Sequence, residues 1–383
     1  MTRDVPGREP APMKAWLATP MEDSAAKALE RVRRAEDVAY VAVMPDVHLA
    51  ADVCVGTAMA TTRLVYPSAV GGDIGCGMLA LAFDAGADVL RDPGHAGALL
   101  RALGGRIPAQ RRSRRYAPPL PVGLSPEGLS HPSLAAAVRD EARLQLGTLG
   151  GGNHFIELQA DESDRLWLMV HSGSRAAGQA VKTHHLARAT VKSASLLALD
   201  TGTDDGRAYL HDQDWARAYA DANRRMMAEH VVGAMRELFR VDAVESSLVA
   251  CDHNHVREEE HFGRRLLVHR KGAMPAGAGL AGVVPGSMGT WSYHVEGRGC
   301  AESLCSSAHG AGRLLSRGAA RDRFTRQDLR RQMGDVWFDP RLAESLREES
   351  PKSYKDVRAV MRAQGELVKV VRTLRPVMVY KER

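Results

Sequence analysis

The stretch Val38-Ala-Tyr-Val-Ala-Val-Met44, followed at once by Pro45-Asp-Val-His48, sets the character of the fold. An apolar run with three valines and a tyrosine predicts a buried strand, and we expect Pro45 to end it. The next apolar tract, residues 53–83, contains five glycines, which is too many for a helix interior. This part of the chain is therefore expected to form strands whose ends carry polar residues on glycine-rich loops.

Further strands and helices alternate downstream. Apolar runs predict strands at residues 166–170, 248–251, 265–269 and 377–380, the first of them delivering His171. Helical spacing predicts helices at residues 133–147, at 215–239 and at 357–374. The last of these is expected to begin after Ser353-Tyr-Lys-Asp356 and to end before Pro376, and the glycine-rich residues 273–289 are expected to form a loop.

The domain organisation follows from what the chain lacks. No internal repeat and no clean linker interrupts it, so we expect one α+β domain over residues 1–383, with mixed β-sheets flanked by helices. Residues 1–35 are expected to be a helical lead-in. Residues 104–132, which include Arg111-Arg-Ser-Arg-Arg115, are expected to form a mobile basic loop.

Composition narrows the class of protein. The chain has 383 residues, 44% of them hydrophobic, with a formal net charge of +6, which permits a nucleic acid partner without requiring one. Five cysteines form no CxxC pair, and no apolar segment near the start has the length of a signal peptide or a membrane span. We therefore expect a reducing, cytoplasmic location and no membrane partner.

Several short segments place a potential ligand beside glycine or just past a strand. They are Met44-Pro-Asp-Val-His48, Gly72-Asp-Ile-Gly-Cys-Gly77, Gly150-Gly-Gly-Asn-His-Phe-Ile-Glu157, Val170-His-Ser-Gly-Ser-Arg175, Cys251-Asp-His-Asn-His255 and Ser306-Ser-Ala-His-Gly-Ala-Gly-Arg313. A single histidine of this kind is more often structural than a ligand. Together they are typical of a metal centre built from loops, because glycine lets the backbone approach an ion closely. Thiolate, imidazole and carboxylate donors suit Mn²⁺, Fe²⁺ or Zn²⁺, and spacing does not choose among them.

His309 differs from the other histidines in its surroundings. The glycines of His309-Gly-Ala-Gly-Arg313 let a phosphate approach, and Arg313 is expected to pair with it. The imidazole there has three possible roles: metal ligand, general acid or nucleophile toward phosphorus. The tract Pro285-Gly-Ser-Met-Gly289 offers backbone N–H groups of the kind that bind anions.

These segments, in this order, resemble the RtcB family of RNA ligases, and the match runs over nearly the whole chain. The resemblance implies a single α+β domain around a deep metal-containing cleft. It also implies an enzyme that joins RNA ends bearing a 3′-phosphate or 2′,3′-cyclic phosphate to 5′-hydroxyl ends, in RNA repair or tRNA splicing. GTP and two Mn²⁺ ions would be its cofactors, and the oligomeric state stays open, with a monomer as one option.

The resemblance also assigns residues. Cys76 would bridge two metal ions, one held also by Asp73 and His154 and the other by His171 and His253. His309 would be the nucleophile that takes GMP, and Asp46 would be catalytic, with a role in handling the RNA end. Contacts to GTP would come from Asn153, His154, Phe155, Ile156, Glu157, His253, Asn254, Pro285, Gly286, Ser287, Met288, Ser292, His309, Gly310, Ala311, Gly312 and Lys381.

Two other classes of function stay open. A metal-dependent phosphodiesterase or phosphatase acting on RNA ends would use the same metal ligands without needing His309 as a nucleophile. A non-enzymatic RNA-binding protein would use the basic run at residues 111–115, although such runs are more often solvated surface. Six other histidines are expected to be structural and not metal ligands: His48, His184, His185, His255, His261 and His269. If one of them does bind a metal, His255 is the first to consider.

Overall fold

The computed structural model describes residues 9–381, and two large sheets dominate it. The first has five strands in the order β1-β2-β3-β12-β11, formed by Met13–Ala15, Val38–His48, Val55–Thr61, Arg264–Lys271 and Asn254–His261. Its β1 and β2 are parallel, and its other neighbouring strands are antiparallel.

The second large sheet has seven antiparallel strands in the order β10-β5-β7-β6-β17-β15-β14. They are Ala243–Asp252, Gly77–Gly86, Arg165–Ser172, Phe155–Ala160, Val368–Tyr380, Ser292–Gly297 and Ala281–Val284. Two small sheets complete the set: β13 with β16, and β4-β9-β8. Their strands are Ala273–Pro275, Ser306–Ala308, Leu64–Val65, Leu196–Asp200 and Val191–Ser193.

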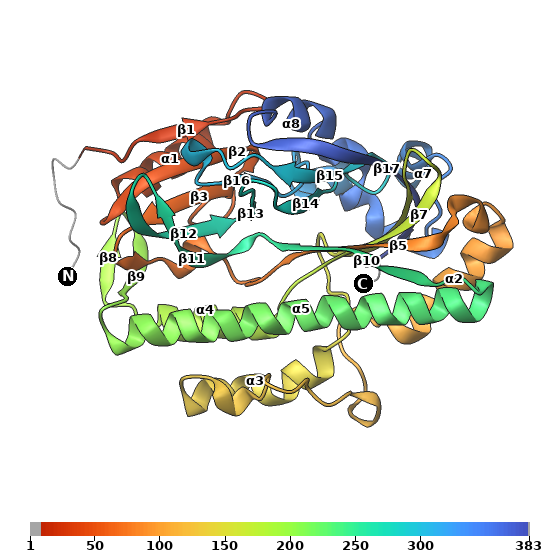
Figure 1. Ribbon diagram of the computed structural model, residues 1–383, viewed down its shortest axis with the longest axis horizontal. Helices are drawn as coiled ribbons and strands as arrows, with labels where there is room; N and C mark the ends of the chain where they lie inside the picture. The colour runs from red at the N-terminus through yellow and green to blue at the C-terminus, as the bar shows by residue number, and fades with distance from the viewer. Residues whose placement is uncertain (1–8, 382–383) are drawn as a thin grey trace.

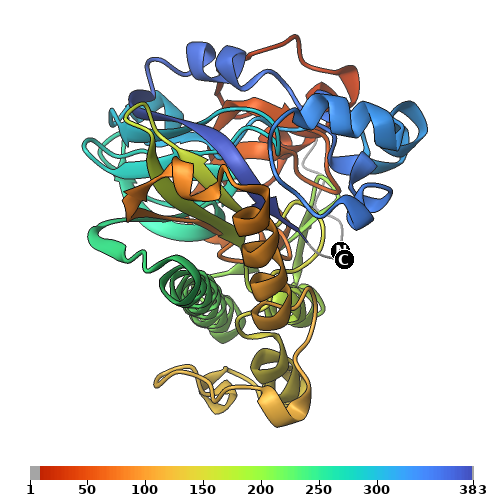
Figure 2. The ribbon, with the colours of Figure 1, turned by 90° about the vertical axis from the view of Figure 1, so that its right-hand side faces the viewer.

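The helices cover the outer surfaces of these sheets. They are α1 to α8, at Asp23–Arg34, Pro93–Arg106, Pro132–Gln145, Arg175–Leu186, Asp204–Phe239, Arg317–Arg323, Arg326–Met333 and Val357–Ala363. The long α5 runs beneath the sheets in Figure 1, and α3 lies on its outer side. Figure 2 looks nearly along α5 and shows the same order of layers, with the C-terminal helices on the opposite side of the sheets.

Two apolar cores hold the large sheets in place. One lies between them and includes Met44 of β2, Val268 of β12 and Val295 of β15. The other lies between the seven-stranded sheet and the helices α2 and α5, and includes Leu99, Leu168 and Val231. Because the first core joins the two sheets, residues at their adjoining strand ends are kept at fixed spacings. The expected α+β fold with mixed sheets is confirmed.

The C-terminal segment differs from its prediction. The helix that begins after the cap of Asp356 ends at Ala363, and residues 368–374 belong to β17 (Val368–Tyr380), which also contains the predicted strand at 377–380. Gly365 follows the helix, and the valines at 368, 370 and 371 favour a strand. Pro376 lies at an irregularity in the pairing with β6, where its missing N–H costs no ladder hydrogen bond.

Pro45 likewise does not end its strand, which continues to His48. The pairing of β2 with β3 is irregular between Val43 and His48, so the proline interrupts no regular ladder. Residues 273–289 contain the strands β13 and β14 and are not only a loop. The long helix begins at Asp204, eleven residues before the predicted start at Trp215.

The N-terminal lead-in is only partly helical. Its residues 1–8 lie outside the described part of the chain, β1 follows, and α1 supplies the predicted helix with Ala25, Leu29 and Val32 buried. Within residues 104–132 the basic run is paired with α3: Arg111 contacts Glu141 and Arg114 contacts Asp140. The mobility of that segment stays a prediction.

None of the helices within residues 9–381 combines the length and the apolar character needed to cross a membrane.

The early start of α5 has a testable cause. Thr203 precedes the helix, and its hydroxyl accepts a hydrogen bond from the Gly206 N–H at 3.3 Å. Thr203→Ala should lower the free energy of unfolding by about 1 kcal/mol, because this N-terminal N–H loses its partner. Urea unfolding would measure the change. Thr203→Ser keeps the hydroxyl and is the control, and equal loss in both variants would contradict the capping role.

Candidate metal centre and nucleotide cleft

Pairing within the seven-stranded sheet brings distant sequence motifs to one edge. Gly77 at the start of β5 pairs with Asp252 at the end of β10 and with Ser172 at the end of β7. Phe155 at the start of β6 pairs with His171. Three loops therefore meet at this edge, beside the end of β7. One carries Asp73 and Cys76, the second carries His154 and the third carries His253.

Glycine at position 77 is required by this arrangement. A Cβ at Gly77 would lie 2.2 Å from the carbonyl oxygen of Cys251, so a side chain there would separate β5 from β10. The close approach sets the depth at which Cys76 lies relative to His253, whose backbone N–H donates to the Cys76 carbonyl at 2.8 Å.

The potential metal donors form two groups that share Cys76. One group is Asp73, Cys76 and His154, and the other is Cys76, His171 and His253, with ligand atoms within 4.8 Å of one another in each. The Cys76 Sγ lies 3.5 Å from His154 Nε2 and 3.3 Å from His171 Nε2. His154 Nε2 lies 2.8 Å from Asp73 Oδ2.

Backbone carbonyls orient two of the imidazoles. His154 Nδ1 lies 3.1 Å from the Leu149 carbonyl oxygen, and His171 Nδ1 lies 3.0 Å from that of Asn153. Because a carbonyl only accepts, each Nδ1 carries the proton, and each Nε2 presents its lone pair toward Cys76. Histidine ligands to metals are commonly held in this way.

The electrostatics of the two groups suit a cation. Burial lowers the pKa of His171 and of His253, so both rings are neutral. Burial, together with the charge of Asp73, raises the pKa of the Cys76 thiol. Asp73 Oδ1 is buried without a hydrogen-bond partner. An unpartnered carboxylate oxygen beside converging lone pairs and a thiol fits a divalent ion, which would favour the thiolate.

His309 lies beside this centre. Its ring centroid is 4.6 Å from that of His253, and its Nδ1 lies 2.6 Å from Oδ2 of the fully buried Asp46. Asp46 also accepts from the His309 backbone N–H at 3.3 Å. The carboxylate thus holds the proton on Nδ1 and leaves Nε2 available as a nucleophile or base.

A cavity of about 740 Å³ adjoins both features and contains most of the predicted nucleotide contacts. Its walls include Asp73, Cys76, Asn153, Phe155, Glu157, His171, His253, Asn254, Pro285, Gly286, Ser287, Met288, His309, Gly310, Ala311, Gly312 and Lys381. Residues that lie hundreds of positions apart in the chain are thus gathered around one space.

Four predicted residues are not part of the cavity wall as described. His154 lies behind Cys76, and Asp46 lies behind His309. The Ile156 side chain is fully buried in the apolar core, so only its backbone is left to face a ligand. The Ser292 hydroxyl accepts from Gln159 Nε2 at 3.0 Å.

Arg313 lies in the cavity wall, and its pairing with a phosphate stays a prediction. Its guanidinium donates to Glu349 Oε1 at 3.1 Å, to the Tyr354 hydroxyl at 3.0 Å, and to the carbonyls of Glu348 and Leu315. Because these partners belong to the protein itself, Arg313 shapes the cavity wall, and four of its five N–H groups already have protein acceptors.

Sequence reasoning missed four charged residues of the cavity wall, which are Glu22, Lys271, Arg317 and Glu349. Glu349 is buried, and its Oε2 lies 3.3 Å from Lys381 Nζ, so the two charges neutralise each other in the wall. Nothing in the sequence around Glu349 signals this. Lys271 ends β12 beside Gly272, and a charge at the end of an apolar strand was a signal that could have been used.

The histidines expected to be structural have protein partners in several cases. His185 contacts Asp212, His261 contacts Glu259, and His269 accepts from the Tyr66 backbone N–H. His255, the first exception to consider, contacts Asp252 and belongs to neither donor group.

Comparison with known proteins adds a separate finding. The profile of the family described as "tRNA-splicing ligase RtcB" matches residues 28–120 and 126–382. The chain is 37% identical to the RNA-splicing ligase RtcB of Escherichia coli K12 over 403 aligned residues, covering 97% of this chain and 98% of that protein. It is 30% identical to RNA-splicing ligase RtcB2 of Escherichia coli ATCC 25922, covering 94% and 93%. It is 32% identical to the tRNA-splicing ligase RtcB of Pyrococcus horikoshii, covering 67% of this chain and 35% of that protein.

Glu157 gives the cavity a measurable pH signature. Burial raises the pKa of this carboxyl to about 8, despite a hydrogen bond from Gln159 and the charge of Lys381. Between about pH 4.5 and 8 the folded protein keeps a proton that the unfolded chain has released. The stabilisation that comes from this retained proton is therefore fully present below about pH 4.5. As the pH rises toward 8, the free energy of unfolding decreases by at most about 1.4 kcal/mol per pH unit.

Glu157→Gln should remove that dependence. The difference in the free energy of unfolding, wild type minus Glu157→Gln, should decrease by at most about 3 kcal/mol as the pH rises from 5 to 7.5. Urea unfolding of chelator-treated protein at several pH values measures it, with Glu127→Gln at an exposed position as the control. A difference that does not change with pH would contradict the raised pKa.

Proposed function

This chain belongs to the RtcB family, and from that premise we propose that it is an RNA ligase that uses GTP. The reaction joins an RNA end bearing a 3′-phosphate or 2′,3′-cyclic phosphate to a 5′-hydroxyl end. The observation that carries the proposal is the position of His309, oriented by Asp46 and in ring contact with a histidine of the candidate metal centre.

Two Mn²⁺ ions are the proposed metals. Asp73, Cys76 and His154 would hold one, and Cys76, His171 and His253 would hold the other. Bound there, the ions would neutralise phosphate charge beside His309. Manganese is chosen on family resemblance, since the donor set also binds other divalent ions.

In the first step His309 Nε2 attacks the α-phosphorus of GTP. An N–P bond forms, the α–β P–O bond breaks, and pyrophosphate leaves, giving a guanylylated histidine. Asp46 keeps the proton on Nδ1 and stabilises the positive charge that develops on the ring. This contact supports a role for Asp46 in orienting His309, in addition to the role at the RNA end suggested by the resemblance.

In the later steps GMP passes to the RNA 3′-phosphate. An oxygen of that phosphate attacks the His309-bound phosphorus, forming a P–O–P anhydride and freeing His309. The 5′-hydroxyl oxygen then attacks the RNA phosphorus, and GMP leaves, a better leaving group than hydroxide. A 2′,3′-cyclic phosphate would first be opened by water, which adds across the 2′ P–O bond and leaves a 3′-phosphate.

The cavity supplies the nucleotide contacts in this proposal. Glu157, neutral at pH 7, would face the base, and the backbone around Gly310 and Gly286 would approach the phosphates. Lys381 Nζ, held by Glu349 and by the Gly152 carbonyl, would close the cavity near the ligand. We also propose a cytoplasmic location, consistent with cysteines that are all free thiols.

The central test is covalent labelling. Metal-free protein incubated with α-³²P-GTP and Mn²⁺ should acquire acid-labile label, and His309→Ala should acquire none. Asp46→Asn should be labelled about 10²–10⁴-fold more slowly, because an amide N–H at Nδ1 favours the wrong ring tautomer. Absence of label on folded wild type with every metal tried would overturn the ligase proposal and favour the phosphodiesterase alternative.

Metal content gives an independent test. Cys76→Ser should reduce the binding of both Mn²⁺ ions, because the two donor groups share this sulfur. His253→Ala should reduce the binding of one ion only. Elemental analysis after equilibrium dialysis counts the ions, and loss of a single ion in Cys76→Ser would contradict the shared ligand.

A further inference from the structure

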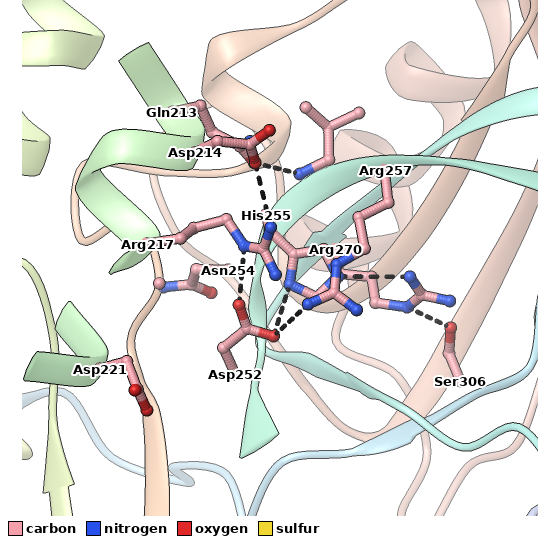
Figure 3. Close-up of polar contacts among 12 residues, drawn as sticks. Gln213, Asp214, Arg217, Asp221, Asp252, Asn254, His255, Arg257, Arg270 and Ser306 are labelled. Carbon is pink, nitrogen blue, oxygen red and sulfur yellow. Dashed lines mark hydrogen bonds and ion pairs between the residues drawn. The ribbon is translucent and has the colours of Figure 1, made fainter. Parts of the chain in front are cut away.

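A chain of polar contacts runs from Arg217 through Asp252, His255 and Arg270 to Ser306 (Figure 3). It begins at Arg217 of α5, whose Nε donates to Asp252 Oδ2 at 2.8 Å. Asp252 Oδ1 lies 3.1 Å from His255 Nδ1, and His255 Nε2 lies 3.3 Å from Arg270 Nη1. Arg270 Nε donates to the Ser306 hydroxyl at 2.9 Å.

The direction of these contacts is fixed by Arg270. A guanidinium only donates, so His255 Nε2 accepts and the His255 proton lies on Nδ1, whose 3.1 Å contact with Asp252 Oδ1 is electrostatic and not a hydrogen bond. Asp252 immediately precedes His253 in the chain, and Ser306 begins the short strand β16 that ends one residue before His309. The contacts therefore run between the segments that carry the two rings.

Arg270 is almost completely buried, with 1% of its surface exposed, and its five donors are all engaged. Besides Ser306 and His255, it donates to both carboxylate oxygens of Glu259 and to the Leu304 carbonyl. Leu304 lies two residues before Ser306, so Arg270 holds the approach to β16 at two points. A lysine, with three donors on a flexible stem, does not replace this planar fork.

Stability alone is a weak reason for such a group. Burying a guanidinium is costly, and an apolar side chain of similar volume is often as stable. The network instead fixes geometry: β16 is only three residues long and pairs only with β13 among the described strands. Arg270 adds a side-chain link to the short β13–β16 pairing, to the contact between Asp46 and His309, and to the hydrogen bond that the Ala308 N–H donates to Gln364 Oε1 at 2.9 Å.

We propose that Arg270 is a positioning residue that fixes His309 at a set distance from the strand end bearing His253. The inference rests on the function proposed above, because the spacing matters for attack of His309 on a phosphate held at the metal centre. A misplacement of about 1 Å costs about 10²-fold in the rate of such a step.

The test uses Arg270→Lys with Arg372→Lys as its matched control. Arg372 also contacts a histidine and a carboxylate, His294 and Asp161, but no segment of the cavity. At saturating GTP, Arg270→Lys should be guanylylated about 10²-fold more slowly. Its Mn²⁺ content and its dissociation constant for a non-reactive GTP analogue should stay within about twofold of wild type, as should every property of the control.

Ser306→Ala removes one contact and keeps the proposal testable if Arg270→Lys does not fold. It should slow labelling by about tenfold or less, in line with the loss of one hydrogen bond. Equal rates in Arg270→Lys, Ser306→Ala and the control would overturn the positioning role. So would a rate loss matched by an equal loss of nucleotide affinity.

Crystal structures of the variants separate this inference from the proposed function. In Arg270→Lys the His309 ring should move relative to His253 by more than about 0.5 Å, the tolerance of a preorganised site. An unmoved ring would overturn the inference even where wild type is labelled. A moved ring in a protein that no GTP labels would support the positioning role and reject the ligase proposal.

Discussion

Alignment of four strand ends is the constraint on which the site depends. The ladder that places β10, β5, β7 and β6 side by side fixes Cys76 within 3.5 Å of two imidazole nitrogens. No residue of the group is adjacent in sequence to another, so loss of this register would disperse the donors. The fold therefore supplies the site by pairing strands, while the loops supply only the donor atoms.

The five-stranded sheet supplies the carboxylate that orients His309. Asp46 comes from β2, which belongs to the five-stranded sheet, whereas the donors around Cys76 come from the edge of the seven-stranded one. The apolar core between the sheets holds Asp46 at a fixed position relative to the donors around Cys76. A buried carboxylate on one sheet therefore faces buried neutral imidazoles carried by the other.

Much of the site was predictable because its residues sit beside glycine at strand ends. The motifs predicted a metal centre, the family resemblance assigned Asp73, Cys76, His154, His171 and His253 to it, and the structure brings these five together. The fold was less predictable wherever a local signal was ambiguous. Residues 368–374 have apolar residues at spacings that also fit a helix, and pairing with β6 and β15 makes them part of the same strand as the predicted residues 377–380. Glu349 lies in an irregular segment, so its burial against Lys381 depends on tertiary contacts that no sequence pattern records.

The place of β17 has a consequence for the order in which the protein is built. It is the last strand along the described chain, yet it lies inside the sheet, between β6 and β15. During synthesis both neighbours must wait, with open edges, until residues 368–380 have left the ribosome. All donors of the candidate metal centre are thus synthesised before β6, the strand that follows His154, can pair with β17. Until then the unpaired edges of β6 and β15 are open to binding by a chaperone.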